Sequence, residues 1–298
     1  MLQTFDERNR DLIVSVNGHL VHRDRAAISP FDSAVQGGDA VWEGLRLYRG
    51  KIFRLEEHLA RLRRSAVALA FASVPSDEEI TGQIRAALRA NEMTDNVHIR
   101  LTLTRGVKIT SGMDPRLNQS GPTLIVLAEH KPPVYDQSGI TLITASVRRP
   151  PPDCLDPKIH HNNLLSSILA KIEANVAGAD DAVMLDQRGF VAETNATHLF
   201  LVAGGRLATP APVACPEGIT RTAVLELAEN AGIGCDVGDL SLTQFYTADE
   251  VFVTGTMGGL TPVTAIDGRT IGGSPGPVTL RLTALFADLT ACSGTPVA

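Results

Sequence analysis

The sequence predicts an α+β protein with two domains, on the basis of three observations. The first third alternates strands with two helices, a turn-rich stretch lies near the middle, and the remainder mixes helices with many short strands. A chain of 298 residues is long enough for two domains or one large one. We expect a small N-terminal domain at 1–130, a linker at 131–139, and a larger domain at 140–298 with a barrel-like sheet.

The first domain is expected to contain two hairpins. LIVSVNGHLVH alternates apolar and polar residues around Asn17-Gly18, and GLRLYRGKIFRL offers a second hairpin around Arg49-Gly50. An Asn-Gly pair is a strong signal for a two-residue turn, because both residues tolerate a positive φ. Two further strands are predicted for NVHIRLTLTRG and PTLIVLAEH.

Two helices are expected between these strands. LEEHLARLRRSAVALA places its apolar residues at helical spacing, which predicts an amphipathic helix. A second helix is predicted at roughly Ser76 to Ala90, because Ser76 and Glu79 form the pattern of a capping box.

The larger domain is expected to begin with a strand, ITLITASVRR, and a helix at Leu164–Val176 that Asn162 or Asn163 caps. The stretch AVMLDQRGFVAETNATHLFLVAGGRLATP predicts a run of strands. ITRTAVLELAENAG and PVTLRLTALFADLTA predict helices, and EVFVTGTMGG predicts a strand that enters a glycine-containing loop.

Composition indicates an ordinary globular protein rather than a nucleic-acid or membrane protein. The hydrophobic share is 44% and the charged share 20%, while the net charge of −6 argues against a nucleic-acid groove. We see no secretory signal and no apolar window long enough to span a membrane. The cysteines lie far apart without a CxxC spacing, so we expect free thiols in a cytoplasmic protein; they are Cys154, Cys215, Cys235 and Cys292.

The stretch DPKIHHNNLLSS raises three possibilities: a metal site, a catalytic lysine, or a loop that caps a helix. Adjacent His160 and His161 would point to different sides of a strand or helix start, which argues against a metal. Lys158 is one of only five lysines and lies between a strand and a helix. Partial desolvation there would lower the pKa of its amine and suit Schiff-base chemistry. Its position alone leaves a structural and a catalytic role equally open.

Three further features are compatible with a cofactor, although each has an ordinary structural explanation. PEGITRTAVLELA opens a helix whose amides at Ile219 and Thr220 would favour an anion. FVTGTMGGLTPV is a strand that runs into a small-residue turn. Glu193 interrupts an apolar strand, either as a buried carboxylate that needs a partner or at an exposed edge. With Lys158, the set matches the requirements of pyridoxal 5′-phosphate.

The chain resembles the class IV (fold type IV) pyridoxal-phosphate aminotransferases, the family of branched-chain and D-amino acid aminotransferases. The likeness runs from about Leu12 to Leu289. It rests on the ordered motifs VWEGLRLY, EEHLARL, KIHHNNLLSSILA, VAETNATHLFLV, PEGITRTAVLELA and TGTMGGLTPV, followed by DGRTIGGSPGPVTLRL. It implies a two-domain fold with a small α/β domain and a larger, barrel-like domain that binds the cofactor.

The resemblance also implies roles for individual residues. Lys158 would be the catalytic residue, which forms the Schiff base and moves the substrate proton. Glu193 would hold the pyridine nitrogen protonated. The phosphate would be bound by four residues: Arg61, Ile219, Thr220 and Thr256. Arg61 is physically reasonable, because His58, Arg61 and Ser65 share one side of the amphipathic helix.

The substrate pocket shows departures from the branched-chain pattern. Gly37, His98 and Asn163 stand at positions where three tyrosines line the pocket in that pattern. Met257-Gly258-Gly259 replaces the usual glutamate-containing loop. Trp42, in the motif VWEG, resembles the pattern of the (R)-selective amine aminotransferases. The substrate-binding residues implied are Arg100, His98, Trp42, Gly37, Met257 and Arg46.

The function that the resemblance implies is transfer of an amino group between a branched-chain-like amino acid and a 2-oxo acid. The alternatives are an (R)-selective amine or D-amino acid transaminase, a lyase of the aminodeoxychorismate lyase type, and a non-catalytic phosphate-binding protein. The family also implies a homodimer or higher homo-oligomer whose sites are completed across the subunit interface. We expect no metal, nucleic acid or membrane partner.

Overall fold

The computed structural model describes residues 3–297, which divide into two compact units. The N-terminal unit holds residues 3–132 together with 159–163 and 290–297, and the C-terminal unit holds 133–158 and 164–289. Each unit has its own sheet and its own apolar core. The chain passes from the C-terminal to the N-terminal unit directly after Lys158 and returns five residues later.

The sheet of the N-terminal unit is antiparallel throughout, in the order β16-β4-β3-β5-β6-β1-β2. Both predicted hairpins are confirmed, since Asn17 and Arg49 each adopt a positive φ between paired strands. The strands are β1 (Ile13–Val16), β2 (His19–His22), β3 (Ala40–Tyr48), β4 (Lys51–Ile52), β5 (Val97–Thr104), β6 (Thr123–His130) and β16 (Thr295–Pro296).

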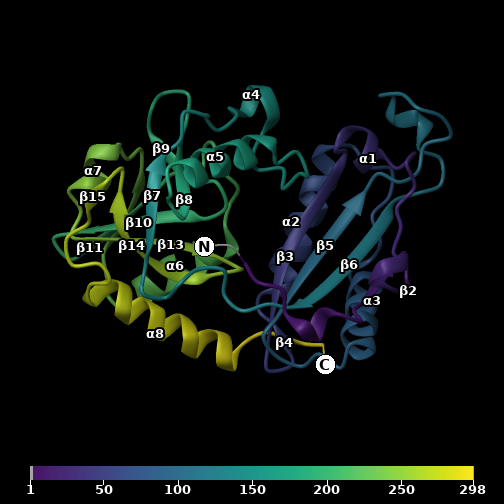
Figure 1. Ribbon diagram of the computed structural model, residues 1–298, viewed down its shortest axis with the longest axis horizontal. Coiled ribbons are helices and arrows are strands. Elements are labelled where there is room, and N and C mark those ends of the chain that lie inside the picture. Colours follow the sequence, from purple (N-terminus) through teal and green to yellow (C-terminus); the bar gives the residue numbers. More distant parts are fainter. Residues whose placement is uncertain (1–2, 298) are drawn as a thin grey trace. The chain divides into compact units, whose positions relative to one another are not determined.

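Two amphipathic helices, α2 (Leu55–Ala68) and α3 (Asp77–Ala90), pack on this sheet (Figure 1). The predicted capping box at Ser76 is present, with both reciprocal hydrogen bonds. Alternate residues of β3 and β5 join the helices in the apolar core, while the residues between them point to the opposite face. The short helices are η1 (Glu7–Asn9), η2 (Arg23–Arg25), α1 (Ser33–Gly37) and η3 (Pro115–Leu117).

The C-terminal unit contains a mixed sheet in the order β12-β11-β10-β13-β14-β7-β8-β9, with β15 paired to β14. β9 at one end also contacts β10 and β11, so the sheet curls, as the prediction of a barrel-like domain requires. The strands are β7 (Ile140–Thr144), β8 (Asp181–Leu185), β9 (Val191–Thr194), β10 (His198–Ala203), β11 (Arg206–Pro210), β12 (Cys235–Gly238), β13 (Glu250–Gly255), β14 (Gly259–Ile266) and β15 (Arg269–Thr270).

The main helices of this part of the chain lie where the sequence predicted them (Figure 1), but the start of α5 differs in its cap. Leu164 is the N-cap and makes no capping bond through its side chain, so the expectation that Asn162 or Asn163 caps this helix is wrong. Both asparagines make their side-chain contacts within the N-terminal unit, to which residues 159–163 belong. The helices are α4 (Pro152–Leu155), α5 (Leu165–Val176), α6 (Ile219–Asn230), α7 (Leu242–Tyr246) and α8 (Pro277–Cys292).

Two further observations concern the chain as a whole. Among residues 3–297, no helix combines the length and the hydropathy that crossing a membrane requires. All four cysteines are free, and Cys154 and Cys292 are exposed.

Candidate functional site

Lys158 lies in a turn between α4 and α5, with an exposed side chain. Its backbone N–H donates to Oδ1 of Asp156 at 2.9 Å, which fixes the turn, while its Nζ lies 3.8 Å from the same oxygen. The side chain is 42% exposed, so burial does not desolvate the amine as the sequence suggested. The lysine presents its amine at the surface of the chain, where a ligand can reach it.

Glu193 lies on β9 and is buried, which decides between the two positions that the sequence left open. Arg149 forms an ion pair with Oε1 of this carboxylate. Arg149 is itself held by the Ser167 hydroxyl at 3.0 Å and the Ala214 carbonyl at 3.3 Å. A buried carboxylate is stable as an anion only with such a partner, so Arg149 supports the ionised form of Glu193.

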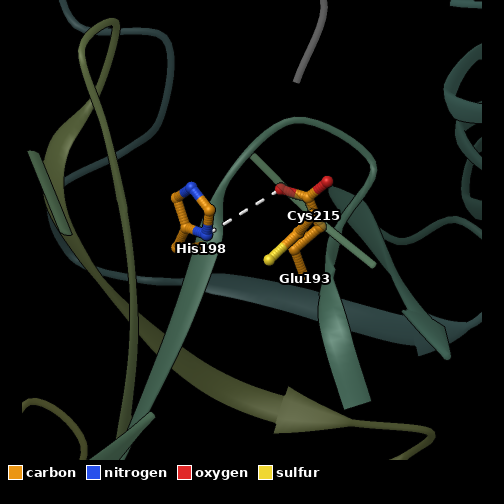
Figure 2. A group of neighbouring side chains, drawn as sticks. All are labelled: Glu193, His198 and Cys215. Carbon is orange, nitrogen blue, oxygen red and sulfur yellow. Dashed lines mark ion pairs between the residues drawn. The ribbon is translucent and has the colours of Figure 1, made fainter. Parts of the chain in front are cut away.

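Glu193 belongs to a group of three neighbouring side chains with His198 and Cys215 (Figure 2). Nδ1 of His198 lies 3.9 Å from Oε2 of Glu193, and one ligand atom from each residue lies within 4.8 Å of the others. Burial, and then the charge of Glu193, raise the pKa of the Cys215 thiol. A protonated thiol and a carboxylate already paired with Arg149 form a poor donor set for a metal ion.

The start of α6 and the β13–β14 turn both lie beside this group. A Cβ added to Gly218, the N-cap of α6, would lie 2.3 Å from the His198 ring, and one added to Gly255, at the end of β13, would lie 3.2 Å from Thr197. The start of α6 and the β13–β14 turn therefore lie against neighbouring residues, 198 and 197, at the start of β10. Burial and Glu193 outweigh the smaller effect of the surrounding cations, of which Lys158 is one, on the pKa of the Cys215 thiol.

The residues predicted to bind phosphate in the C-terminal unit lie at these two elements. Ile219 and Thr220 are the first residues of α6 and are buried. Amides of a first helical turn have no acceptor within the helix, and the helix dipole favours an anion there. Thr256 opens the β13–β14 turn, followed by Met257, whose carbonyl accepts a hydrogen bond from the backbone N–H of Val134 at 3.3 Å.

Arg61 lies in the N-terminal unit, where it pairs with a glutamate that the sequence analysis did not assign a role. Its Nε and Nη2 donate to the two carboxylate oxygens of Glu43 at 2.8 and 2.7 Å, and Nδ1 of His58 lies 2.7 Å from Glu43 Oε2. Burial acts to raise the pKa of Glu43, but Arg61 and His160 outweigh it and hold the pKa well below its usual range. The expected sharing of one helix face by His58, Arg61 and Ser65 is met, since all three are buried.

The predicted substrate residues Trp42, Arg46, His98 and Arg100 lie on the sheet face opposite α2 and α3. Arg46 is paired with His98 in register across β3 and β5, and Gly44 with Arg100. Nη1 of Arg46 and both ring nitrogens of His98 are buried without a hydrogen-bond partner among the described residues. Burial, and then three nearby cations, lower the pKa of His98 to about 3, so the ring is neutral at physiological pH.

Of the three remaining predicted pocket positions, Gly37 and Asn163 lie near each other at the end of α1. Gly37 is exposed, and a Cβ added there would meet nothing within 4 Å. Nδ2 of Asn163 donates to the carbonyl of Gly38 at 3.1 Å. The N-terminal unit therefore brings together five of the predicted pocket positions and Asn163, while Met257 lies in the C-terminal unit.

Comparison with known proteins gives one consistent result. A family model described as amino-transferase class IV matches residues 40–266. The chain belongs to the class IV aminotransferases. It is 57% identical over 291 residues to branched-chain-amino-acid aminotransferase-like protein 2 of Arabidopsis thaliana, covering 97% of this chain and 52% of that protein. It is 42% identical to a putative branched-chain-amino-acid aminotransferase of Methanocaldococcus jannaschii, covering 93% of this chain and 96% of that protein.

Solved structures of branched-chain aminotransferases share the fold. The branched-chain amino acid aminotransferase of Thermobaculum terrenum, in its PLP form (holo form), superposes with a TM-score of 0.84 at 27% identity, covering 95% of both chains. The predicted fold class, fold type IV, is thereby confirmed. The chain spans about half the length of the two Arabidopsis relatives.

Within this class IV aminotransferase, sequence reasoning missed the charged partners of the site residues. Glu43 was noted only as part of a motif, and Arg149 and Cys215 were given no role. One signal was available for Glu43, because it shares the alternation of Val41 and Leu45 in β3 and therefore had to be buried. No comparable signal exists for Arg149, whose contact with Glu193 depends on the tertiary fold.

Proposed function

We propose that the chain is a transaminase that binds pyridoxal 5′-phosphate (PLP) and moves an amino group between an amino acid and a 2-oxo acid. The observation that carries the proposal is that the α6 N-terminus and the β13–β14 turn of the C-terminal unit lie beside the group that contains the buried Glu193. Membership of the class IV aminotransferases supports it, as does the PLP form of a solved relative.

The donor set fits this cofactor. A phosphate needs backbone amides and a hydroxyl, which the first turn of α6 and Thr256 supply. A protonated ring nitrogen needs a buried anion, and Glu193 is kept ionised by Arg149. The cofactor aldehyde needs an accessible amine, which Lys158 presents.

Each residue then has a definite task. When bound, the cofactor supplies an aldehyde carbon for the amino group and a ring that accepts electrons. Lys158 would hold the cofactor through its amine and, when freed, would carry the proton from the substrate Cα to the aldehyde carbon of the cofactor. Glu193 keeps a proton at the ring nitrogen, which strengthens the ring as an electron acceptor. Ile219, Thr220 and Thr256 fix the phosphate.

Arg61 is proposed as a further phosphate ligand on the ground of the family motif that contains it. In the N-terminal unit its guanidinium forks onto Glu43, which holds it in one orientation. Arg61→Met separates the two roles. If Arg61 binds the phosphate, the substitution should weaken the binding of both pyridoxal phosphate and free phosphate. If Arg61 is purely structural, the substitution should lower only the stability of the fold.

The substrate carboxylate is proposed to bind at Arg46 and His98, with Gly37 as a further pocket residue of the N-terminal unit. The support is the set of buried donors without partners among the described residues, Nη1 of Arg46 and the ring nitrogens of His98, because leaving such groups unsatisfied is costly. A neutral imidazole can donate one hydrogen bond to a carboxylate while Arg46 supplies the charge.

The first test removes the amine. The Lys158→Ala variant is expected to lose all transamination and the absorbance of covalently held cofactor, and borohydride should no longer fix the cofactor to the chain. Lys51→Ala is the matched control, because Lys51 is in a hairpin with its Nζ 3.4 Å from a backbone carbonyl. Turnover in Lys158→Ala, or loss of cofactor in the control, would contradict the proposal.

The second test identifies the donor. L-Leucine, D-alanine and (R)-1-phenylethylamine are supplied with one 2-oxo acid. We expect the branched-chain L-amino acid to react fastest, in keeping with the names of the relatives. Preference for the amine or the D-amino acid would overturn this substrate class but keep the transaminase, and repeated turnover of a donor without a 2-oxo acid would indicate a lyase instead.

A homodimer is proposed from an apolar stripe on α5. Its exposed large residues recur at helical spacing, on one side of the helix; they are Leu165, Ile168, Leu169, Ile172 and Val176. Exposed stripes of this kind mark protein interfaces. Analytical ultracentrifugation should show a dimer for the wild type and a monomer for Ile168→Glu/Ile172→Glu, and an unchanged mass would exclude this face.

A cytoplasmic location is proposed from the free cysteines, two of which are exposed. Exposed thiols persist in reducing compartments. Cell fractionation with a tagged chain tests this, and recovery from an oxidising compartment would contradict it.

A further inference from the structure

Residues 160–162 extend the sheet of the N-terminal unit along β3. The backbone N–H of Trp42 donates to the carbonyl of His160 at 2.9 Å, and that of Asn162 donates to the carbonyl of Ala40 at 2.9 Å. β4 pairs only with the far end of β3, so this part of the edge is available to the segment. Residues 160–162 are therefore held against β3 by an isolated antiparallel bridge between Val41 and His161.

The side chain of Trp42 reinforces this pairing. Its Nε1–H donates to the carbonyl of His161 at 3.1 Å, and its ring stacks on that of His160 with centroids 4.3 Å apart. Nδ1 of His160 is in turn 2.6 Å from the Trp42 carbonyl. The only hydrogen-bond donor of the indole, Nε1–H, is therefore used by the backbone of residues 160–162.

Arg100 reaches the same segment from β5. Its Nη2 donates to Oδ1 of Asn162 at 2.8 Å, and its guanidinium carbon lies 3.5 Å from the centroid of the Trp42 ring. Arg100 stands opposite Gly44 in the register, where β3 carries no side chain. A cation over an indole and a charge-assisted hydrogen bond in a largely buried place are among the stronger polar contacts.

We propose that Trp42 and Arg100 are positioning residues for Lys158, an inference that rests on the proposed function of that lysine. The Lys158 ammonium lies 3.8 Å from the carboxylate of Asp156, which is beyond hydrogen-bond distance. The location of the amine is therefore set by its backbone, and that backbone is anchored two to four residues later through His160, His161 and Asn162.

This role differs from direct contact between Arg100 and the substrate. A positioning arginine acts through Asn162, so removing either partner of the bond should have the same consequence. A substrate-binding arginine acts on the carboxylate, so removing Asn162 should leave substrate affinity almost intact. The two roles therefore separate in a double-mutant cycle.

The experiment compares Arg100→Met, Asn162→Ala and the double variant in the cofactor-loaded protein. We expect each single variant to lower kcat about tenfold with less than about a twofold change in KM for the 2-oxo acid, and the double variant to be no worse than either. The pH midpoint of the absorbance change of the loaded protein should shift equally in all three, because it reports the surroundings of the Lys158 nitrogen.

A second readout does not depend on activity. Hydrogen–deuterium exchange at the amides of Trp42 and Asn162 should become at least about tenfold faster in both single variants, because both amides belong to the pairing that the side chains stabilise. Asn162→Asp keeps the acceptor oxygen and should retain slow exchange. Arg89→Met, on an exposed position of α3, controls for loss of an arginine.

The outcomes distinguish this inference from the proposed function. A rise in KM of about tenfold or more in Arg100→Met, with Asn162→Ala unchanged, would assign Arg100 to the substrate and overturn the positioning role. Slow exchange retained in both variants would also overturn it. A wild type that transaminates no donor would refute the proposed function, whereas the exchange arm would still report on the anchoring of residues 160–162.

Discussion

Each unit contains one buried glutamate on a strand beside an arginine and a histidine, and the surroundings of the two differ. Glu43 receives two hydrogen bonds from Arg61 and one from His58, and His160 lies 3.5 Å from its Oε1. Glu193 receives an ion pair from Arg149, while its neighbouring His198 lies at 3.9 Å, beyond hydrogen-bond distance.

The difference shows that residue types alone do not define a site. Both groups consist of a carboxylate, an arginine and a histidine, yet the Glu43 group ties α2 to β3, whereas the Glu193 group lies beside the start of α6 and the β13–β14 turn. We infer that Glu43 serves the fold and Glu193 serves the ligand. Substitution of Glu43 should therefore lower mainly the stability of the fold, and substitution of Glu193 mainly the activity.

The largest effect is expected for Glu43→Gln. Breaking a buried ion pair leaves Arg61 uncompensated in the core and typically costs about 3–5 kcal/mol. Urea unfolding followed by circular dichroism measures this as a lower midpoint with an unchanged slope. Glu57→Gln, on the exposed face of the same helix as Arg61, is the control and should not change the midpoint. A loss below about 1 kcal/mol would show that the Glu43 group contributes little to the fold.

The next effect is expected for Glu193→Gln, and on activity. The amide cannot hold a proton at the cofactor nitrogen, and loss of one charge-assisted hydrogen bond of about 1.5–3 kcal/mol corresponds to roughly a tenfold to hundredfold decrease in kcat. Steady-state kinetics with the best donor measures it. Unchanged kcat with a large loss of stability would make Glu193 a second structural glutamate and remove the contrast.

The sequence predicted correctly those features that depend on residues close to each other along the chain. The turn at Asn17 and the cap at Ser76 were correct, because both depend on residues within a few positions of each other. The cap expected at Asn162 was wrong, because its side-chain oxygen is taken by Arg100, 62 positions away. A local pattern identifies a capping group but not a competing tertiary partner.

For the candidate site, too, the sequence indicated individual residues but not the contacts between distant segments. Lys158 and Glu193 were identified from motifs, and the proximity of the α6 start and the β13–β14 turn could only be seen in the fold. Exposure of Lys158 was not anticipated, since the sequence does not state which side of a turn is covered. The partners Arg61 for Glu43 and Arg149 for Glu193 depend likewise on packing between distant segments.

A smaller, pH-dependent effect should separate Glu43 from other acids. Burial opposes ionisation, but Arg61 and His160 keep the pKa of Glu43 well below the ordinary 4.5 in the folded chain. The unfolded chain therefore takes up a proton first as pH falls, so this stabilisation is complete above pH 4.5 and is lost below it, towards the folded pKa. One proton corresponds to a slope of at most about 1.4 kcal/mol per pH unit.

Urea unfolding at several pH values below the ordinary pKa of 4.5 measures that slope. The wild type should lose stability more steeply than Glu43→Gln, whose amide does not titrate. Parallel curves for the two proteins would mean that the carboxyl titrates alike in both states, and Glu43 would then not be held as an anion by its partners.

The smallest effect is expected for Gly218→Ala, which tests the Glu193 side of the comparison. The added Cβ would lie 2.3 Å from the His198 ring, so the ring must move. We expect a loss of stability of about 1 kcal/mol, at the low end for overpacking because a side chain rather than backbone yields. Displacing the ring also crowds the first turn of α6, so the affinity for pyridoxal phosphate, and for free phosphate, should fall by a few-fold.

Gly82→Ala is the matched control, because the added Cβ meets nothing within 4 Å in the middle of α3. This substitution should raise stability by about 0.5–1 kcal/mol, since alanine loses less conformational freedom in a helix. Thermal unfolding with and without phosphate separates the two variants: Gly218→Ala should lose part of the phosphate-induced shift, whereas Gly82→Ala keeps all of it. An equal phosphate shift in both would mean that the start of α6 does not bind the anion.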